Sequence, residues 1–62
     1  MDDVYRSNDT GVKVHAHLVD APIWVVDFDG NKVLVEPGEY LITEPFVDHI
    51  EQELFEQEYE HV

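Results

Sequence analysis

The sequence predicts a small α+β domain, an antiparallel meander of four strands, or five if residues 49–51 add one, with one short C-terminal helix. Three observations lead to this fold class. Apolar residues alternate with polar ones in short runs through the first two thirds of the chain, which is typical of half-buried strands. Gly-containing turn signals separate these runs. Near the C-terminus the apolar spacing changes to a helical period.

The first strand is predicted over residues 12–18, "VKVHAHL", where every second residue is apolar. A turn at Pro22 follows, and "IWVVDF" (residues 23–28) is rich in the β-branched and aromatic residues that favour strands. The third and fourth strands are predicted as "KVLVE" (residues 32–36) and "YLIT" (residues 40–43).

Two turn signals support this order of strands. Asp29-Gly30 is a strong hairpin signal, because glycine tolerates the positive φ of a tight turn between twisted strands, so the second and third strands should be antiparallel neighbours. Pro37 and Gly38 suit the second and third positions of a turn before the fourth strand.

A helix is predicted from about Gln52 to the C-terminus. A helix that began at Phe46 would bury charge, whereas the shorter one places Phe55, Tyr59 and Val62 on its inner stripe. Its outer face would carry three glutamates, Glu53, Glu56 and Glu60. Residues 46–51, "FVDHIE", are expected to form a loop with a short fifth strand at most.

Residues 1–11 are expected to form a flexible arm, because only two of them are apolar anchors, and residues 12–62 a single small domain. Whether the arm docks on the domain stays open. A chain of 62 residues buries only about 60% of its unfolded surface, and this one has no cysteine to staple it. The absence of a long apolar run and of a basic N-terminal segment predicts no membrane association, and an intracellular location fits the absence of cysteine.

The charge balance indicates the kind of partner. The chain has 15 Asp and Glu against three Lys and Arg, a net charge of −12, and no Lys or Arg after Lys32. Direct binding to nucleic acid needs clustered positive charge and is therefore excluded. A surface whose charges all have the same sign destabilises the fold through self-repulsion. We therefore interpret the carboxylates as a surface that binds a basic protein, and not only as a solvated face.

Two pairs of residues could in principle form a metal site or a catalytic site, but simpler explanations account for both. His15 and His17 share one face of a strand, but no third ligand follows at a diagnostic spacing, so no metal or other cofactor is predicted. Asp27 and Asp29 could act as an acid–base pair, but turn formation beside Gly30 explains Asp29, and so small a core leaves little room for a closed pocket. The chain is not expected to be an enzyme.

Two stretches, "VEPGEYLI" and "LFEQEYEHV", resemble those of small phage and prophage proteins with a Pro-Gly-acidic-aromatic turn and a C-terminal Phe-Glu-x-x-Tyr-Glu segment. The resemblance covers residues 24–62, and the chain departs from the pattern between Thr43 and Glu53. It implies a viral origin, and with it a location in the host cytoplasm, and a small α+β fold, and it supplies no catalytic residue. The residues that carry it are Pro37, Gly38, Tyr40, Phe55, Glu56, Tyr59 and Glu60.

These observations predict an acidic phage-encoded protein that mimics nucleic acid and inhibits a basic, nucleic-acid-binding host protein. The alternative is a small structural or accessory phage domain whose acidity reflects a high-salt host. Trp24 and Tyr40 are the aromatic residues expected at the surface, as binding hot spots. The oligomeric state stays open, a homodimer included. The predicted partner-binding residues are Glu44, Asp48, Glu51, Glu53, Glu56, Glu60, Trp24 and Tyr40.

Overall fold

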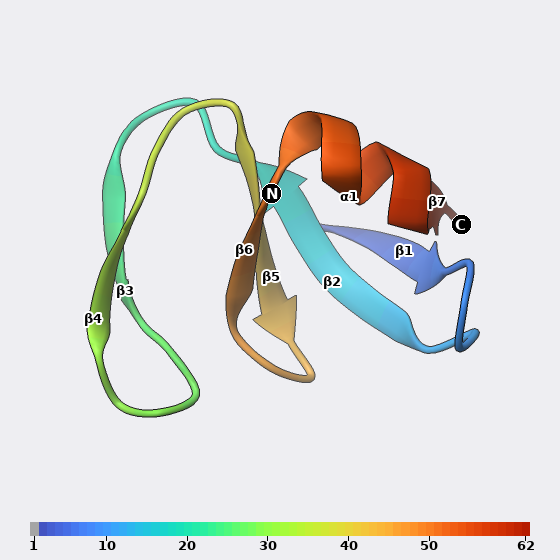
Figure 1. Cartoon of the computed structure of the whole chain (residues 1–62), viewed down its shortest axis with the longest axis horizontal. Coiled ribbons are helices and arrows are strands. Elements are labelled where there is room, and N and C mark those ends of the chain that lie inside the picture. Colours follow the sequence, from blue (N-terminus) through green and yellow to red (C-terminus); the bar gives the residue numbers. More distant parts are fainter. Residues whose placement is uncertain (1) are drawn as a thin grey trace.

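The computed structural model describes residues 2–62, which form seven strands in two antiparallel sheets and one short helix (Figure 1). The antiparallel sheet and the short C-terminal helix are confirmed, whereas the predicted four or five strands are too few. In chain order the elements are β1 (Asp3–Ser7), β2 (Lys13–Leu18), β3 (Ile23–Val26), β4 (Lys32–Val35), β5 (Glu39–Glu44), β6 (Asp48–Glu51), α1 (Gln52–Glu58) and β7 (Tyr59–His61).

The main sheet has the strand order β6-β5-β2-β1-β7, and the prediction of a simple meander is wrong. β2 pairs with β5 rather than with β3. The chain leaves the main sheet after β2, forms the separate β3–β4 hairpin and returns as β5. Two backbone hydrogen bonds close this excursion, from Val19 N to Glu39 O (2.8 Å) and from Gly38 N to Val19 O (3.2 Å).

The β3–β4 hairpin confirms that the second and third predicted strands are antiparallel neighbours. Gly30 has a φ of 84°, a left-handed conformation that glycine adopts without steric cost. The Asp27 carboxylate accepts hydrogen bonds from the backbone N–H groups of Asp29 and Asn31, both at 2.9 Å. Asp27 therefore stabilises the turn, as aspartate commonly does.

The N-terminal segment is not the loose arm that the sequence predicted. Asp3–Ser7 form β1, which is hydrogen-bonded to β2 on one side and to β7 on the other. Tyr5 packs against the main core. Two apolar residues suffice here because the strand gains backbone partners along both edges.

The C-terminal segment changes structure at Tyr59, so the helix is shorter than predicted. α1 ends at Glu58, and Tyr59 is extended (φ −129°, ψ 151°) and starts β7 against β1. The edge of β1 offers this segment a strand partner, which an isolated sequence pattern does not reveal. Val62 is exposed, not on a buried stripe. The fifth strand, which the sequence left undecided at residues 49–51, is present as β6 and pairs with β5.

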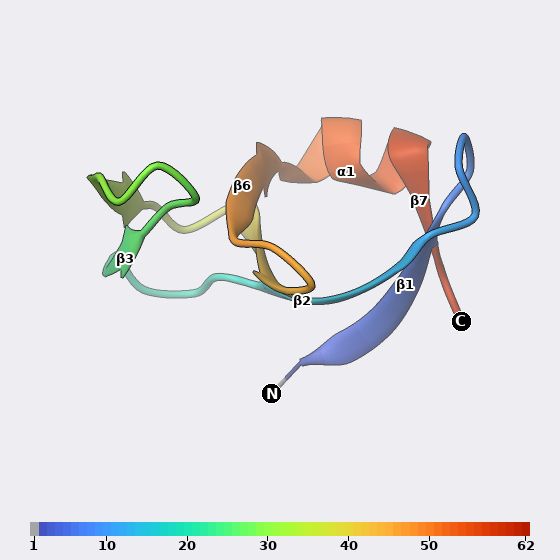
Figure 2. The same cartoon turned by 90° about the horizontal axis from the view of Figure 1, so that it is seen from below.

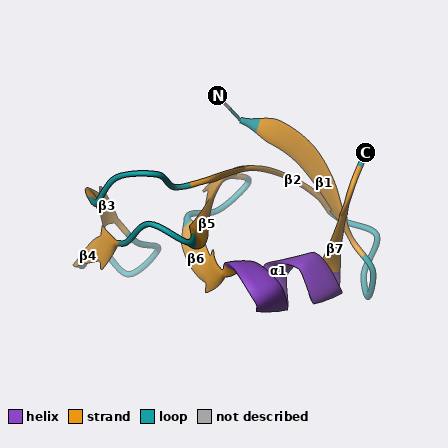
Figure 3. Ribbon diagram, turned by 90° about the horizontal axis from the view of Figure 1, so that it is seen from above, coloured by secondary structure: helices purple, strands orange, loops and turns teal. Residues whose placement is uncertain are grey.

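α1 lies against one face of the main sheet (Figures 2 and 3). Phe55, which is 1% exposed, anchors it in a core cluster with Tyr40 and Ile42 of β5 and with Val14 and Ala16 of β2. A second cluster connects the hairpin to the main sheet through Val19, Val35 and Leu41. Among residues 2–62, no helix has the length and apolar character that a membrane crossing needs.

Candidate functional site

The six predicted partner-binding carboxylates are all exposed, but the fold divides them among three places. Glu51 lies directly before α1, and Glu53 and Glu56 are on the helix. Glu44 and Asp48 lie at the other end of the β5–β6 hairpin, because the register sets Glu51 opposite Glu39 at the helix end. Three residues along β6 separate Asp48 from Glu51 by about 10 Å. Glu60 lies on β7.

Glu60 differs from the others because it has a cationic partner. Arg6 donates a hydrogen bond of 2.6 Å to its carboxylate across the β1–β7 pair. Within residues 2–62 this is the single ion pair that involves Lys or Arg. Glu53 and Glu56 have no Lys or Arg partner within residues 2–62, although Glu56 accepts hydrogen bonds from the Tyr40 hydroxyl and the Gln52 amide.

The start of α1 concentrates negative charge. Glu39 and Glu51 are direct cross-strand partners, a placement of like charges that destabilises a sheet. His49 lies beside this pair, with its Nδ1 3.2 Å from the Glu39 carboxylate, within hydrogen-bond distance. Glu53 in the first helical turn is favourably placed toward the helix dipole. The three exposed carboxylates at this place, Glu51 of β6 and Glu53 and Glu56 of α1, are called the acidic helix face below.

The other end of α1 is held by the β1–β2 turn. No basic residue lies in the last turn of the helix, yet its terminal carbonyls need partners. Asn8 supplies them, because its side-chain amide donates to Gln57 O (3.1 Å) and its backbone N–H donates to Glu58 O (2.8 Å). Asn8 therefore fixes the helix end against the turn.

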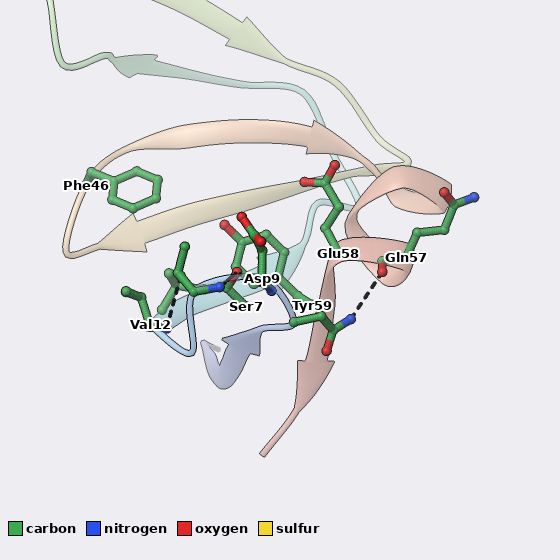
Figure 4. A pocket seen from close by; sticks show the side chains of 10 residues that line it. Ser7, Asp9, Val12, Phe46, Gln57, Glu58 and Tyr59 are labelled. Carbon is green, nitrogen blue, oxygen red and sulfur yellow. Dashed lines mark hydrogen bonds between the residues drawn. The ribbon is translucent and has the colours of Figure 1, made fainter.

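An open groove of about 800 Å³ lies where this turn meets the helix (Figure 4). Val12, Val14, Phe46 and Tyr59 contribute apolar surface to it, and Asp9 and Glu58 contribute carboxylates. Burial raises the pKa of Tyr59, with further contributions from the charges of Glu58 and Asp48. Ser7, Asn8, Thr10 and Gln57 complete the lining.

Sequence reasoning missed this groove. Asp9 and Glu58 belong to segments that meet only because β1 pairs with β7, and the N-terminal segment was expected to be loose. No local pattern in the sequence predicts that these two segments lie side by side. An apolar floor beside two carboxylates suits a Lys or Arg side chain, whose aliphatic stem packs while its charged end is paired.

Of the two aromatic residues expected at the surface, one is exposed and the other is buried. Trp24 is 65% exposed on the hairpin, as predicted. Tyr40 is 8% exposed, so its predicted place on a binding surface is wrong. Its ring stacks on Phe55 with centroids 4.1 Å apart, and its hydroxyl donates a long hydrogen bond (3.4 Å) to Glu56. Tyr40 packs in the core because its strand lies under α1.

The burial of Tyr40 predicts a loss of stability at high pH. Desolvation, together with the neighbouring Tyr5 and Glu56, raises the pKa of Tyr40 to about 12, from about 10 in an unfolded chain. The stabilising contribution is fully present below pH 10 and is lost as the pH rises to 12, because the unfolded chain releases this proton first. Denaturant titrations should show a decline on the order of 1 to 3 kcal/mol. The variant Tyr40→Phe should decline less steeply; an equal decline would contradict the assignment to Tyr40.

His17 is already engaged within the fold. Its Nδ1 contacts the Asp2 carboxylate, and Thr43 Oγ1 donates to the other Asp2 oxygen at 2.6 Å. The hydrogen bond from Thr43, followed by that from His17, lowers the pKa of Asp2. Within residues 2–62, no group of three or more potential ligands of a metal ion is assembled. His15 and His17 thus lie among residues that tie the N-terminal segment to β2 and β5.

No protein-family model, curated protein or solved structure matches this chain. The resemblance to small phage and prophage proteins therefore stays a prediction. What the chain can bind has to be inferred from its own surface, of which the acidic helix face and the adjoining groove are the most distinctive parts.

Proposed function

We propose that this protein is a non-enzymatic, phage-encoded inhibitor whose acidic helix face occupies the basic cleft of a host nucleic-acid-binding protein. The observation that carries the proposal is the set of three exposed carboxylates, Glu51 directly before α1 and Glu53 and Glu56 on it, with no Lys or Arg paired to them among the described residues. These carboxylates stand in for backbone phosphates. The phage origin is taken from the resemblance.

The spacing of these charges supports mimicry. Glu53 and Glu56 are three residues apart on one helix, so their Cβ atoms lie about 5 to 6 Å apart. A nucleic-acid strand carries one charge per about 3.4 Å of helix axis, a comparable density along a line. A cleft that binds phosphates through Lys and Arg can therefore contact successive carboxylates.

The groove beside Glu58 adds a second kind of contact. A basic cleft presents Lys and Arg side chains at its rim, and one of them can lie across Tyr59 with its charged end near Asp9 and Glu58. Long-range attraction of the acidic surface accelerates the encounter. The groove then contributes specificity that charge alone does not give.

The proposal is tested by competition for DNA. Purified host nucleases, restriction or CRISPR effectors and transcription proteins are each loaded with a labelled duplex, and displacement by this protein is measured. The double variant Glu53→Gln/Glu56→Gln should need at least about tenfold more protein for half displacement, because exposed charges steer association.

The matched control removes the same amount of charge elsewhere. Asp20→Asn/Asp29→Asn replaces two exposed carboxylates outside the helix and should displace DNA almost as well as the wild type. If both double variants lose potency equally, or if the wild type displaces nothing, the helix face is not the binding surface. That outcome would favour the alternative, an accessory phage domain whose acidity is an adaptation to a high-salt host.

A further inference from the structure

The β3–β4 hairpin turns one of its two faces away from the rest of the molecule. Opposed residues of an antiparallel pair lie on the same face, and faces alternate along each strand. Val25 and Val35 pack on the second core cluster. The cross-strand pairs Trp24↔Leu34 and Val26↔Lys32 therefore form the outer face, on which Trp24 is 65%, Val26 56% and Leu34 37% exposed.

This outer face collects three exposed apolar side chains, Trp24, Val26 and Leu34, on one side of a two-stranded ribbon. In Figure 1 the hairpin stands beside the main sheet, and its two strands pair only with each other. A two-stranded ribbon is marginally stable in water without further packing. A contiguous apolar surface on it, with Lys32 as its neighbour, marks an interaction site.

The distribution of charge indicates what covers the face. Residues 22–35 contain Asp27, Asp29 and Lys32, a net charge of −1 in a chain whose total is −12. A basic protein is attracted to the acidic parts of the chain and not to this one. For two copies of the chain the hairpin is the surface that meets with least repulsion.

We propose that the outer face of the β3–β4 hairpin is a homodimer interface. Glu36 is the first residue after β4 and is exposed. Because the following Pro37 favours an extended conformation at this residue, the alternation of β4 continues to Glu36 and directs it to the same face as Leu34 and Lys32. Lys32 and Glu36 thus lie on opposite sides of Leu34, each about 7 Å from it along the strand. Opposite charges flank an apolar centre.

A twofold axis that crosses both strands at the Trp24–Leu34 pair makes this pattern self-complementary. The axis reverses the strand direction of the second copy, so Lys32 of each copy faces Glu36 of the other. Trp24 and Leu34 then pack against their own counterparts at the axis. Such isologous contacts are the commonest way in which identical chains associate.

The interface is small, which sets the expected affinity. Stable complexes bury about 800 Å² per partner, more than the exposed parts of three apolar side chains provide. The dimer should therefore form with micromolar or weaker affinity and dissociate on dilution.

The experiment combines sedimentation velocity with tryptophan emission over a range from about 10 μM to about 1 mM protein. Trp24 is the single tryptophan, so its emission reports on this face alone. For the wild type we expect a rise from monomer to dimer mass with concentration, and a blue shift of the emission over the same range. A wild type that stays monomeric throughout would overturn the proposal.

Variants that reverse the charges of Lys32 and Glu36 test the proposed twofold arrangement. Lys32→Glu and Glu36→Lys should each weaken association at least about tenfold, because each sets like charges against one another. The combined variant Lys32→Glu/Glu36→Lys has the wild-type net charge and should recover association to within about threefold.

The Glu36→Lys variant separates this geometry from general repulsion. It makes the chain less acidic, so a contact governed by net charge alone would strengthen, whereas the proposed interface weakens. Stronger association of Glu36→Lys, or no recovery in the combined variant, would overturn the arrangement. Circular dichroism of each variant confirms that the fold is retained before association is compared.

Discussion

Replacing Phe55 by alanine is expected to lower the free energy of unfolding by about 3 to 5 kcal/mol, which is a large part of the total stability of so small a chain. A chain of 62 residues has a total stability of only about 3 to 9 kcal/mol. Phe55 is 1% exposed. Its ring contacts those of Tyr5, Tyr40 and Tyr59 at centroid distances of 5.0, 4.1 and 4.6 Å.

The size of this effect follows from the place of the side chain. Phe55 is the buried residue of α1, so its loss leaves a cavity between helix and sheet that the neighbouring rings cannot fill without moving. Thermal unfolding followed by circular dichroism measures the change. Leu54→Ala is the control, because Leu54 is the next residue of the helix and is 47% exposed; it should cost less than about 1 kcal/mol. Equal losses in the two variants would show that α1 does not pack on the sheet through Phe55.

Deleting residues 1–7 is expected to abolish cooperative unfolding altogether. β1 lies between β2 and β7, so the deletion removes two antiparallel pairings at once and takes Tyr5 out of the core. It also removes Arg6, the cationic partner of Glu60. The unpaired N–H and C=O groups of β2 and β7 would be left to water, and β7 would have no neighbour.

Far-ultraviolet circular dichroism and a heat-capacity scan test this result. The control deletes Val62, an exposed terminal residue that contributes one backbone hydrogen bond, from its N–H to Val4 O at 3.0 Å. That deletion should preserve a cooperative transition. A cooperative transition in the chain without residues 1–7 would restore the interpretation of this segment as a dispensable arm.

Both experiments bear on function as well as on folding. Asn8 and Asp9 follow β1 directly, and they hold the end of α1 and one side of the groove. A chain without β1 would therefore lose the groove together with its stability. Glu53 and Glu56 lie on the exposed side of α1, but Glu56 also accepts the hydrogen bond from Tyr40, which stacks on Phe55. Thermal unfolding of the charge variants therefore accompanies the binding measurement, so that loss of binding is separated from loss of fold.

The strongest local patterns determined the elements that they cover. Alternation predicted β2, and the Asp29-Gly30 turn predicted the β3–β4 hairpin, because both depend on residues close together in the chain. The inward direction of Phe55 and the exposure of Glu53 and Glu56 followed from helical spacing. The excess of carboxylates was known from the composition, because the number of charged residues does not depend on the fold.

Only the tertiary structure decided the order of the strands and the exposure of single residues. β1 has weak local signals and forms because β2 and β7 each offer it an edge. Tyr59 is extended and not helical for the same reason, because the backbone hydrogen bonds of β7 with β1 stabilise this segment more than a longer helix would. Tyr40 is buried because α1 lies over β5, and Trp24 is exposed because its hairpin stands outside the main sheet. Each of these outcomes depends on contacts between segments that are distant in sequence, and such contacts leave no periodic trace in either segment alone.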